Sequence, residues 1–298
     1  MPPGNRKSRI RNLIIVAAIL LVAGVCFAWV VGSSLIAPAQ RAVTLPENFA
    51  GTEVIFPSAS GSTLRGNFLK GQRGRGVVVL MHGVRGNRGA MAKHAQFLHA
   101  HGYSVLLFDF QAHGESPGRK ITSGYLESMD ATAAVEFACK QMPGEKIAIL
   151  GASLGGAAAL LADPPLPVDG MILEMVYPDI RRAVKNRIAI VLGNWARVFS
   201  PLLTWQIKPR VGVSADWLSP ERRIASLRCP KLIIAAANDR HTTVADTRSL
   251  YAAATEPKEL WIIENAAHEN LYARTGPEYE RRILAFLEKS FSNKPSLR

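Results

Sequence analysis

Three residue types that together make a nucleophilic catalyst occur in this sequence, each shortly after a short apolar run. Ser153 stands in ILGASLGG, Asp239 follows KLIIAAAN, and His268 follows LWIIENAA. A serine hydroxyl is a weak nucleophile unless a base takes its proton, and that base needs a carboxylate to orient it. These residues therefore predict attack on an acyl group, with Ser153 as nucleophile, His268 as base and Asp239 as acid.

Ser153 is flanked by glycines two positions before it and two positions after it, at Gly151 and Gly155. In the pattern GxSxG a strand ends and a helix begins at the serine, and small residues relieve clashes at the sharp turn. The helix amino terminus adds partial positive charge near the oxygen. The same pattern also fits a small-residue helix packed closely on a sheet, and the Asp and His after later strands favour the nucleophile.

A tetrahedral intermediate needs hydrogen-bond donors for its oxyanion. The segment VVVLMHGVRGNRG ends another apolar run, and we expect the backbone N–H groups of Val84 and Leu154 to be the donors. His82 is expected to brace this loop. Arg85 has two interpretations: it faces the solvent, or it attracts an anionic substrate.

Other polar residues compete for these roles. His241 is a rival base, but its position two residues after Asp239 favours a lining role. Glu174 is an alternative acid. We expect no metal site, because the histidines of the 88–101 region lack a nearby carboxylate or cysteine to complete one; they are His94, His99 and His101. No cofactor is expected.

The elements that must position these residues alternate along the chain. Short apolar or β-rich runs lie at 52–56, 63–69, 77–81, 104–108, 146–150, 171–173, 231–236 and 259–263. Helix-like segments lie near 88–101, 123–141, 154–162, 243–254 and 277–291. Apolar strands alternating with helices predict a mostly parallel sheet with helices on both faces, whose reactive groups gather at the strands' carboxyl ends.

The connection between the strands near 171–173 and 231–236 is far longer than is usual between a strand and its neighbour. We expect a helical lid over about residues 177–226. Between Tyr177 and Arg228 there are ten Lys or Arg and three acids, and the tryptophans of this stretch are Trp195, Trp205 and Trp217. Either the lid rests on anionic headgroups and admits lipid-derived esters, or its tryptophans pack on the core and its charges are solvated.

Residues 13–39 contain no charged side chain, and a helix of about 20 apolar residues spans a bilayer core. We expect a transmembrane signal anchor at 13–36, after a basic cytoplasmic tail at 1–12, because cations before the apolar run favour a cytoplasmic amino end. A linker at 37–51 would lead to a catalytic domain on the periplasmic or extracytoplasmic side. The alternative is secretion after signal cleavage near Ala39.

The net charge of +13 invites a nucleic-acid interpretation, but most of it lies in the amino-terminal tail and the expected lid. We therefore expect no nucleic-acid partner. Three cysteines are present, and Cys26 lies in the apolar run, so only Cys139 and Cys229 remain as a pair that the fold could bring together.

The motifs MHGVRGNR, LLFDFQAHGES, GASLGG, NDRHT and AAHENLY occur in this order, and through them the sequence resembles the serine α/β-hydrolase superfamily over about residues 52–291, leaving 292–298 as a tail. It is most similar to the esterase-like and prolyl-oligopeptidase-like branch, whose loop equivalent to Asp109, His113 and Ser116 shapes the site without doing the chemistry. The resemblance implies an α/β-hydrolase fold and the nucleophile, acid and base named above.

The sequence thus predicts a membrane-anchored serine hydrolase that cleaves carboxylic esters, small-molecule or lipid-derived, through an acyl-enzyme. The fold alone does not fix the substrate. A serine peptidase or thioesterase with the same triad stays open, as does a non-catalytic envelope protein that uses the fold for interaction. The sequence leaves the oligomeric state open.

Overall fold

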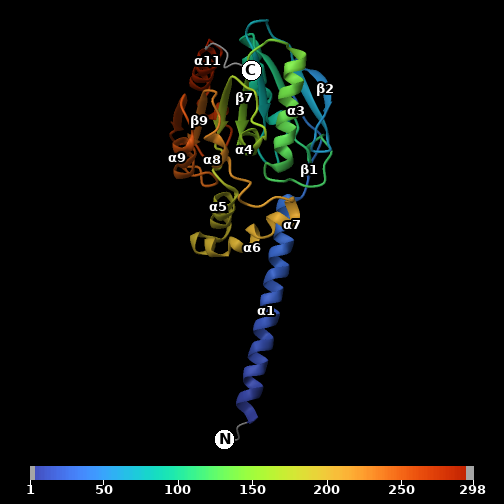
Figure 1. Ribbon diagram of the computed structural model, residues 1–298, viewed down its shortest axis with the longest axis vertical. Helices are drawn as coiled ribbons and strands as arrows, with labels where there is room; N and C mark the ends of the chain where they lie inside the picture. The colour runs from blue at the N-terminus through green and yellow to red at the C-terminus, as the bar shows by residue number, and fades with distance from the viewer. Residues whose placement is uncertain (1–3, 293–298) are drawn as a thin grey trace.

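An eight-stranded sheet in the order β10-β9-β8-β7-β4-β5-β3-β2 forms the centre of the globular part (Figure 1). The computed structural model describes residues 4–292. The β2–β3 and β3–β5 pairs are antiparallel, and all other neighbouring strands run parallel. The strands are β2 (Thr52–Pro57), β3 (Thr63–Leu69), β4 (Val77–Met81), β5 (Ser104–Phe108), β7 (Ile147–Ala152), β8 (Gly170–Glu174), β9 (Lys231–Ala236) and β10 (Lys258–Ile263). The predicted mostly parallel sheet is confirmed.

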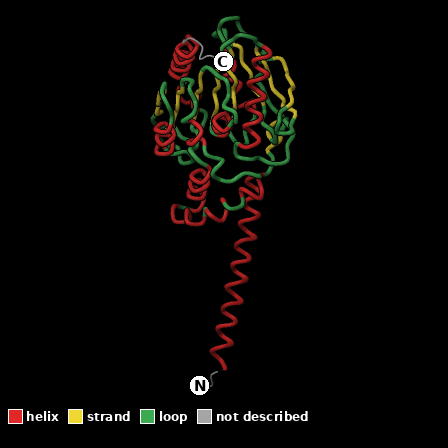
Figure 2. The backbone as a smooth tube through the Cα atoms, viewed as in Figure 1, coloured by secondary structure: helices red, strands yellow, loops and turns green. Residues whose placement is uncertain are grey.

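Helices cover both faces of this sheet (Figure 2). Alternate side chains of β4 enter opposite layers: Val77 and Val79 pack with one core cluster, Val78 and Leu80 with the other. The first cluster is covered by α3 (Tyr125–Gln141), α4 (Leu154–Leu161), α8 (Pro220–Ile224) and α9 (Val244–Ala253). The second is covered by α2 (Ala92–Ala100), which follows η1 (Arg88–Met91), and by α10 (Leu271–Thr275) and α11 (Pro277–Ser292).

The chain between β8 and β9 leaves the sheet and forms a group of short helices. We call residues 177–226 the inserted segment. It holds α5 (Ile180–Leu192), η2 (Asn194–Phe199), α6 (Pro201–Thr204), α7 (Ile207–Val211) and finally α8. In Figure 1, α5, α6 and α7 lie below the sheet, on the side from which α1 extends. The long connection predicted from the sequence is therefore helical.

Helix α1 (Gly4–Ile36) projects away from the globular part as one long rod (Figure 1). Its stretch Ser8–Ile36 has a mean hydropathy of 3.0, and its length and composition would allow it to cross a membrane. Most of its side chains are exposed, but Ala28 and Gly32 are buried against the inserted segment. The carboxyl end of this helix is therefore in contact with the domain.

The residues after α1 are also fixed to the domain. β1 (Ala39–Gln40) pairs with β6 (His113–Gly114) as a small two-stranded sheet. The N–H of Ala39 donates to the carbonyl of Ala112 at 2.8 Å, and that of Arg41 to the carbonyl of Gly114 at 2.8 Å. The stretch that sequence analysis treated as a linker thus begins with a docked strand, a pairing too short to give a pattern in the sequence.

Candidate active site

Ser153 lies at the junction where β7 ends and α4 begins, with a backbone φ of 50°. A non-glycine residue in this left-handed region is strained, and such strain often marks functional sites. The N–H of Ser153 donates to the carbonyl of Glu174 in β8 at 2.7 Å, which fixes the turn. Gly155 is required next to it, because a Cβ there would lie 2.2 Å from the backbone oxygen of Met81. The close approach of α4 to the sheet therefore depends on Gly155.

His268 and Asp239 follow β10 and β9, two adjacent parallel strands, so their loops meet at the same edge of the sheet as Ser153. The Nδ1 of His268 lies 2.7 Å from Oδ2 of Asp239. Oδ1 of Asp239 accepts hydrogen bonds from the N–H groups of His241 at 2.7 Å and Thr242 at 2.9 Å. This buried carboxylate is thus held in place, and the other ring nitrogen of His268 is left for the pocket.

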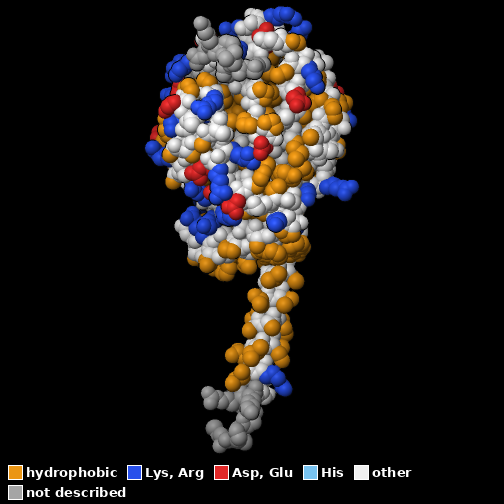
Figure 3. Space-filling model, in the orientation of Figure 1, with side chains coloured by type: hydrophobic (Ala, Val, Ile, Leu, Met, Phe, Trp, Pro, Cys, Tyr) orange, Lys and Arg blue, Asp and Glu red, His pale blue; other side chains and the backbone are white. Residues whose placement is uncertain are grey.

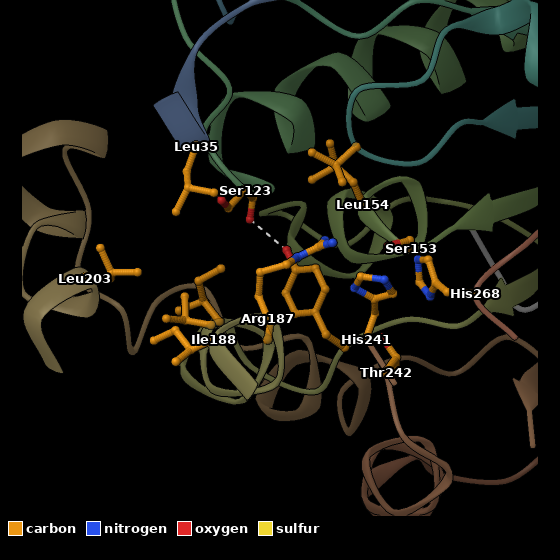
Figure 4. A pocket seen from close by; sticks show the side chains of 15 residues that line it. Leu35, Ser123, Ser153, Leu154, Arg187, Ile188, Leu203, His241, Thr242 and His268 are labelled. Atoms are coloured by element: carbon orange, nitrogen blue, oxygen red, sulfur yellow. Dashed lines mark hydrogen bonds between the residues drawn. The ribbon is translucent and has the colours of Figure 1, made fainter. Parts of the chain in front are cut away.

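Ser153 and His268 line one pocket and lie side by side in Figure 4. The pocket has a volume of about 840 Å³ and is bounded mainly by apolar side chains. The structure therefore brings the three sequence-predicted residues together: the serine and the histidine at the pocket, and the aspartate behind the histidine. A serine, an imidazole and an orienting carboxylate are the groups that covalent acyl transfer requires.

Val84 and Leu154 also line this pocket. Leu154 is the first residue of α4, so its N–H has no acceptor within the helix. The N–H of Val84 donates no hydrogen bond to any part of the chain between residues 4 and 292. Both amides thus lack an acceptor within the described residues, and their role as oxyanion donors stays a prediction.

His241 lies against His268, with ring centroids 4.9 Å apart and the ring planes tilted by 56°. It lines the pocket beside His268 (Figure 4). Burial lowers the pKa of His241, and the nearby Arg187 and His268 lower it further. Its Nδ1 is buried and has no hydrogen-bond partner within the described residues. This neutral imidazole is therefore a lining group, while the hydrogen bond to Asp239 belongs to His268.

The other polar candidates face away from the pocket. Glu174 is buried and accepts a hydrogen bond from the phenol of Tyr279, and burial raises its pKa to about 7. The imidazole of His82 is buried, which lowers its pKa to about 3. Its Nε2 accepts from the N–H of Phe110 at 3.2 Å, and its Nδ1 donates to the carbonyl of Gly83 at 2.8 Å. His82 thus ties the loop of Val84 to the neighbouring strand.

The loop that carries Asp109 is held by a buried ion pair. Arg88 bonds the Asp109 carboxylate through both its backbone N–H and its guanidinium. The hydroxyl of Ser116 donates to the carbonyl of Asp109 at 2.7 Å and accepts from the N–H of Arg65 at 3.0 Å. The Nδ1 of His113 pairs with the carbonyl of Gln111 at 2.9 Å. These residues brace the loop against the sheet.

No cluster of histidine, cysteine, aspartate and glutamate suited to a metal ion occurs within residues 4–292. His94 is buried and lies between the rings of Tyr272 and Tyr279, with centroid distances of 5.2 and 5.5 Å. His99 lies in α2, and His101 follows its last residue. His94 and His99 therefore lie in the helix expected near 88–101, and His101 lies directly after it.

Two pocket residues escaped the sequence analysis. Leu35, from the end of α1, lines the pocket together with Ser153 and His268, which lie more than 100 positions later in the chain. Arg187, in α5, also lines it, and partial desolvation lowers the pKa of its guanidinium. Within the described chain this guanidinium makes no hydrogen bond or ion pair. Neither residue belongs to a motif, so only the packing of α1 and α5 over the sheet reveals them.

Comparison with known proteins agrees with this fold. Residues 72–221 match the model of the family described as serine aminopeptidase, S33. The uncharacterized protein Rv2307c of Mycobacterium tuberculosis is 30% identical over 275 residues, which cover 88% of this chain and 90% of that protein. The lysophosphatidylserine lipase ABHD12 of Xenopus tropicalis is 26% identical over 170 residues, 55% of this chain and 42% of that lipase.

Among solved structures, the Pyrococcus furiosus esterase Pf2001 is similar to this chain with a TM-score of 0.67 and 22% identity. The similarity covers 84% of this chain and 98% of the esterase. At this identity the likeness is one of fold. Together with the family match and the relative at 30% identity, it establishes that the chain belongs to the serine aminopeptidase S33-type family of α/β-hydrolases.

Proposed function

We propose that this α/β-hydrolase is a membrane-anchored serine esterase that acts through an acyl-enzyme. The observation that carries the proposal is the placement of Ser153 on a strained turn beside His268, whose Nδ1 is 2.7 Å from the buried carboxylate of Asp239. A nucleophile, a base and an orienting group in one apolar pocket meet the geometric requirements of covalent acyl transfer.

In the proposed reaction, Oγ of Ser153 attacks the ester carbonyl while Nε2 of His268 takes its proton. Asp239 holds the imidazole in the required tautomer and stabilises the imidazolium. The amides of Val84 and Leu154 bind the oxyanion of the tetrahedral intermediate. The intermediate collapses to the acyl-serine, and the alcohol leaves with the proton from His268. Water then attacks the acyl-serine by the same proton transfers and releases the carboxylic acid.

The charges around the pocket favour esters over the peptides implied by the family's description. An aminopeptidase must bind a free α-ammonium group, which needs acceptors or negative charge. The charged side chain at the pocket is instead the cation Arg187, and the adjoining outer opening is lined by Arg85, Arg187 and one acid, Glu269. The names of a structural neighbour, an esterase, and of a relative, a lipase, support the same choice.

Membrane anchoring is proposed from α1. Its apolar stretch is largely exposed, so the folded domain does not bury it, and Arg9 and Arg11 at its amino end favour a cytoplasmic amino terminus. Retention is favoured over cleavage near Ala39, because Gln206 donates a hydrogen bond to the carbonyl of Ala28 at 3.0 Å, and the guanidinium of Arg210 lies over the ring of Trp29 at 3.8 Å. Removal of the helix would remove these contacts of the inserted segment. The domain boundaries 1–12, 13–36, 37–51, 52–291 and 292–298 are proposed with it.

The test is labelling by a fluorophosphonate probe, which reacts only with an activated serine. We expect the wild-type protein, purified in detergent, to be labelled and to hydrolyse p-nitrophenyl butyrate. Ser153→Ala is expected to lose both signals while keeping the wild-type melting temperature. Absence of labelling in folded wild-type protein would overturn the proposed activity, and labelling of Ser153→Ala would overturn the assignment of the nucleophile.

A further inference from the structure

A second cavity, an apolar groove, runs between α1 and the inserted segment. One wall is α1 between Gly24 and Leu35, and the other is formed by α5, η2 and α6. Its lining contains one charged residue, Arg187, and otherwise only apolar side chains and glycine, among them Phe27, Val31 and Leu202. The groove has a volume of about 1060 Å³. A surface of this composition suits a hydrocarbon chain and offers almost nothing to a polar ligand.

The groove is continuous with the pocket that holds Ser153. Four residues line both: Leu35, Arg187, Ile188 and Leu203. Figure 4 shows Leu35 and Leu203 on the side of the pocket away from Ser153, with Arg187 and Ile188 between them and the His241–His268 pair. A chain attached to a carbonyl at Ser153 would therefore pass beside Arg187 and Ile188 to enter the groove.

The α1 wall is held rigidly in place by polar contacts along its outer side. Nε2 of Gln206 donates to the carbonyl of Ala28, and Nη1 of Arg210 donates to Oγ of Ser33 at 3.0 Å. Arg85 donates to the carbonyl of Ser34 near the carboxyl end of α1, where a cation also complements the helix dipole. The inserted segment and the loop of Val84 both form hydrogen bonds with α1, and these contacts hold the groove together.

The groove lies next to an exposed apolar surface of the inserted segment. We call it the interfacial surface; it consists of Val191, Leu192, Trp195, Val198, Phe199 and Trp205. Trp195 is 70% exposed and Val198 is 71% exposed. A contiguous apolar patch of this kind is rare on soluble monomers and marks an interaction or membrane surface. Figure 3 shows apolar side chains gathered at the base of the globular part, around the point where α1 leaves it. Tryptophans in this position are typical of membrane interfaces.

The α1 residues of the groove lie at a level of the helix that corresponds to one half of a bilayer core. A hydrocarbon core of about 30 Å takes about 20 helical residues, which from Leu13 extend to about Gly32. The groove residues Gly24, Phe27 and Val31 then lie in the half of the core nearer to the domain. At this depth the groove would meet lipid acyl chains from the side, and the opening lined by Arg85 and Glu269 offers charged groups to the polar part of a lipid.

We infer that α1 is part of the substrate site: the groove admits the long acyl chain of a membrane lipid ester from the bilayer, and the ester carbonyl stops at Ser153. This inference rests on the proposed esterase function and names its substrate class. The acyl chain lies between α1 and α5 and stays on the serine after the alcohol leaves through the polar opening. The anchor is then a specificity element as well as a tether.

The test fills the groove from its α1 side. Val31→Trp places a large ring in the groove, and Val30→Trp places the same ring one residue away on a side of α1 that does not line it. Both variants are studied in phosphatidylcholine nanodiscs with p-nitrophenyl palmitate and p-nitrophenyl butyrate. We expect Val31→Trp to lower kcat/KM on the palmitate at least tenfold and to leave fluorophosphonate labelling and the butyrate within twofold. Val30→Trp should leave all three within twofold.

Equal palmitate activity in the two variants would overturn the inference, and so would an equal loss on both esters in Val31→Trp. A direct readout is a hexadecyl fluorophosphonate with a diazirine at the chain end. After reaction with Ser153, its irradiation should crosslink the probe to a peptide containing residues 24–35. Crosslinks confined to parts of the domain outside both walls of the groove would also overturn it. If wild-type protein fails to react with any fluorophosphonate, the proposed esterase function fails instead, so the two failures are distinct.

Discussion

Tyr279 in α11 donates its phenolic hydrogen bond to the buried carboxylate of Glu174 at the end of β8. Glu174 follows a strand like Asp239 does, so its position in the sequence is compatible with the role of catalytic acid. In the fold its side chain is buried and bonded to Tyr279, which belongs to the core layer of α11. The hydrogen bond to Tyr279 thus explains how a strand-end carboxylate can serve the core rather than the pocket.

The first prediction concerns pH. Burial raises the pKa of Glu174 to about 7, from about 4.5 when unfolded. Between these values the native state binds more protons than the unfolded state, so Glu174 lowers the free energy of unfolding as pH rises through this window. Glu174→Gln keeps an acceptor for Tyr279 and removes the titration. We expect its melting temperature, relative to wild type, to rise from pH 5 to about pH 7 and to level off above that. A constant difference would contradict the assignment.

A second prediction separates the two candidate acids by activity. Asp239→Asn keeps the shape of the side chain but loses the charge that orients His268, and such a change lowers kcat by about 10²–10⁴-fold in serine hydrolases. Glu174→Gln is expected to stay within threefold of wild type on p-nitrophenyl butyrate. Glu264→Gln, an exposed carboxylate after β10, is the matched control. Loss of activity in Glu174→Gln with retention in Asp239→Asn would reverse the assignment.

The third prediction concerns Gly155. A methyl group there would lie 2.2 Å from the backbone oxygen of Met81, and because this contact is with the backbone of β4, no flexible side chain can move aside to relieve it. Gly155→Ala is therefore expected to move α4 away from the sheet and to destabilise the protein by about 2–4 kcal/mol. Thermal melts and the rate of fluorophosphonate labelling measure the two effects. Gly24→Ala, where a Cβ meets nothing within 4 Å, should leave the melting temperature unchanged or raised.

Much of the fold was predictable because its signals are local. The strands β3, β4, β5 and β9 coincide with the predicted runs, since each is an apolar or β-rich segment bounded by turn residues. The meeting of Ser153, Asp239 and His268 followed from one rule, that parallel strands present their carboxyl ends at one edge. Glycines around Ser153 were readable for the same reason, because the turn imposes its residue types on the neighbouring positions.

The contacts of α1 could not be predicted in the same way. An apolar helix that spans a membrane and one that also lines a pocket have the same composition, and the residues that dock it, Gln206 and Arg210, look like ordinary polar residues of the inserted segment. The two interpretations of the tryptophans, packing on the core and exposure to a membrane, apply to different residues. Trp217 packs against Tyr125 at 5.1 Å, whereas Trp195 and Trp205 stay exposed. Only tertiary packing distinguishes these cases.

The last prediction concerns Arg187, which stands where the pocket, the groove and the polar opening meet. Its guanidinium forms no ion pair with a side chain of residues 4–292, although the charge of Asp239 acts on it and opposes the desolvation that lowers its pKa. We expect an anionic group on the substrate's alcohol side to pair with it. A charge-assisted hydrogen bond contributes about 1.5–3 kcal/mol. Arg187→Met should therefore lower kcat/KM about ten- to a hundredfold on a long-chain lysophosphatidic acid and leave a neutral monoacylglycerol within threefold.

Lys185→Met is the matched control, since Lys185 lies on the same helix, is exposed and does not line the pocket. It should leave both substrates unchanged. Rising salt should narrow the difference between the two substrates in wild-type protein, because an accessible charge pair is screened. An equal loss on the anionic and the neutral ester in Arg187→Met would show that the side chain acts through its packing beside Ile188 and not through its charge.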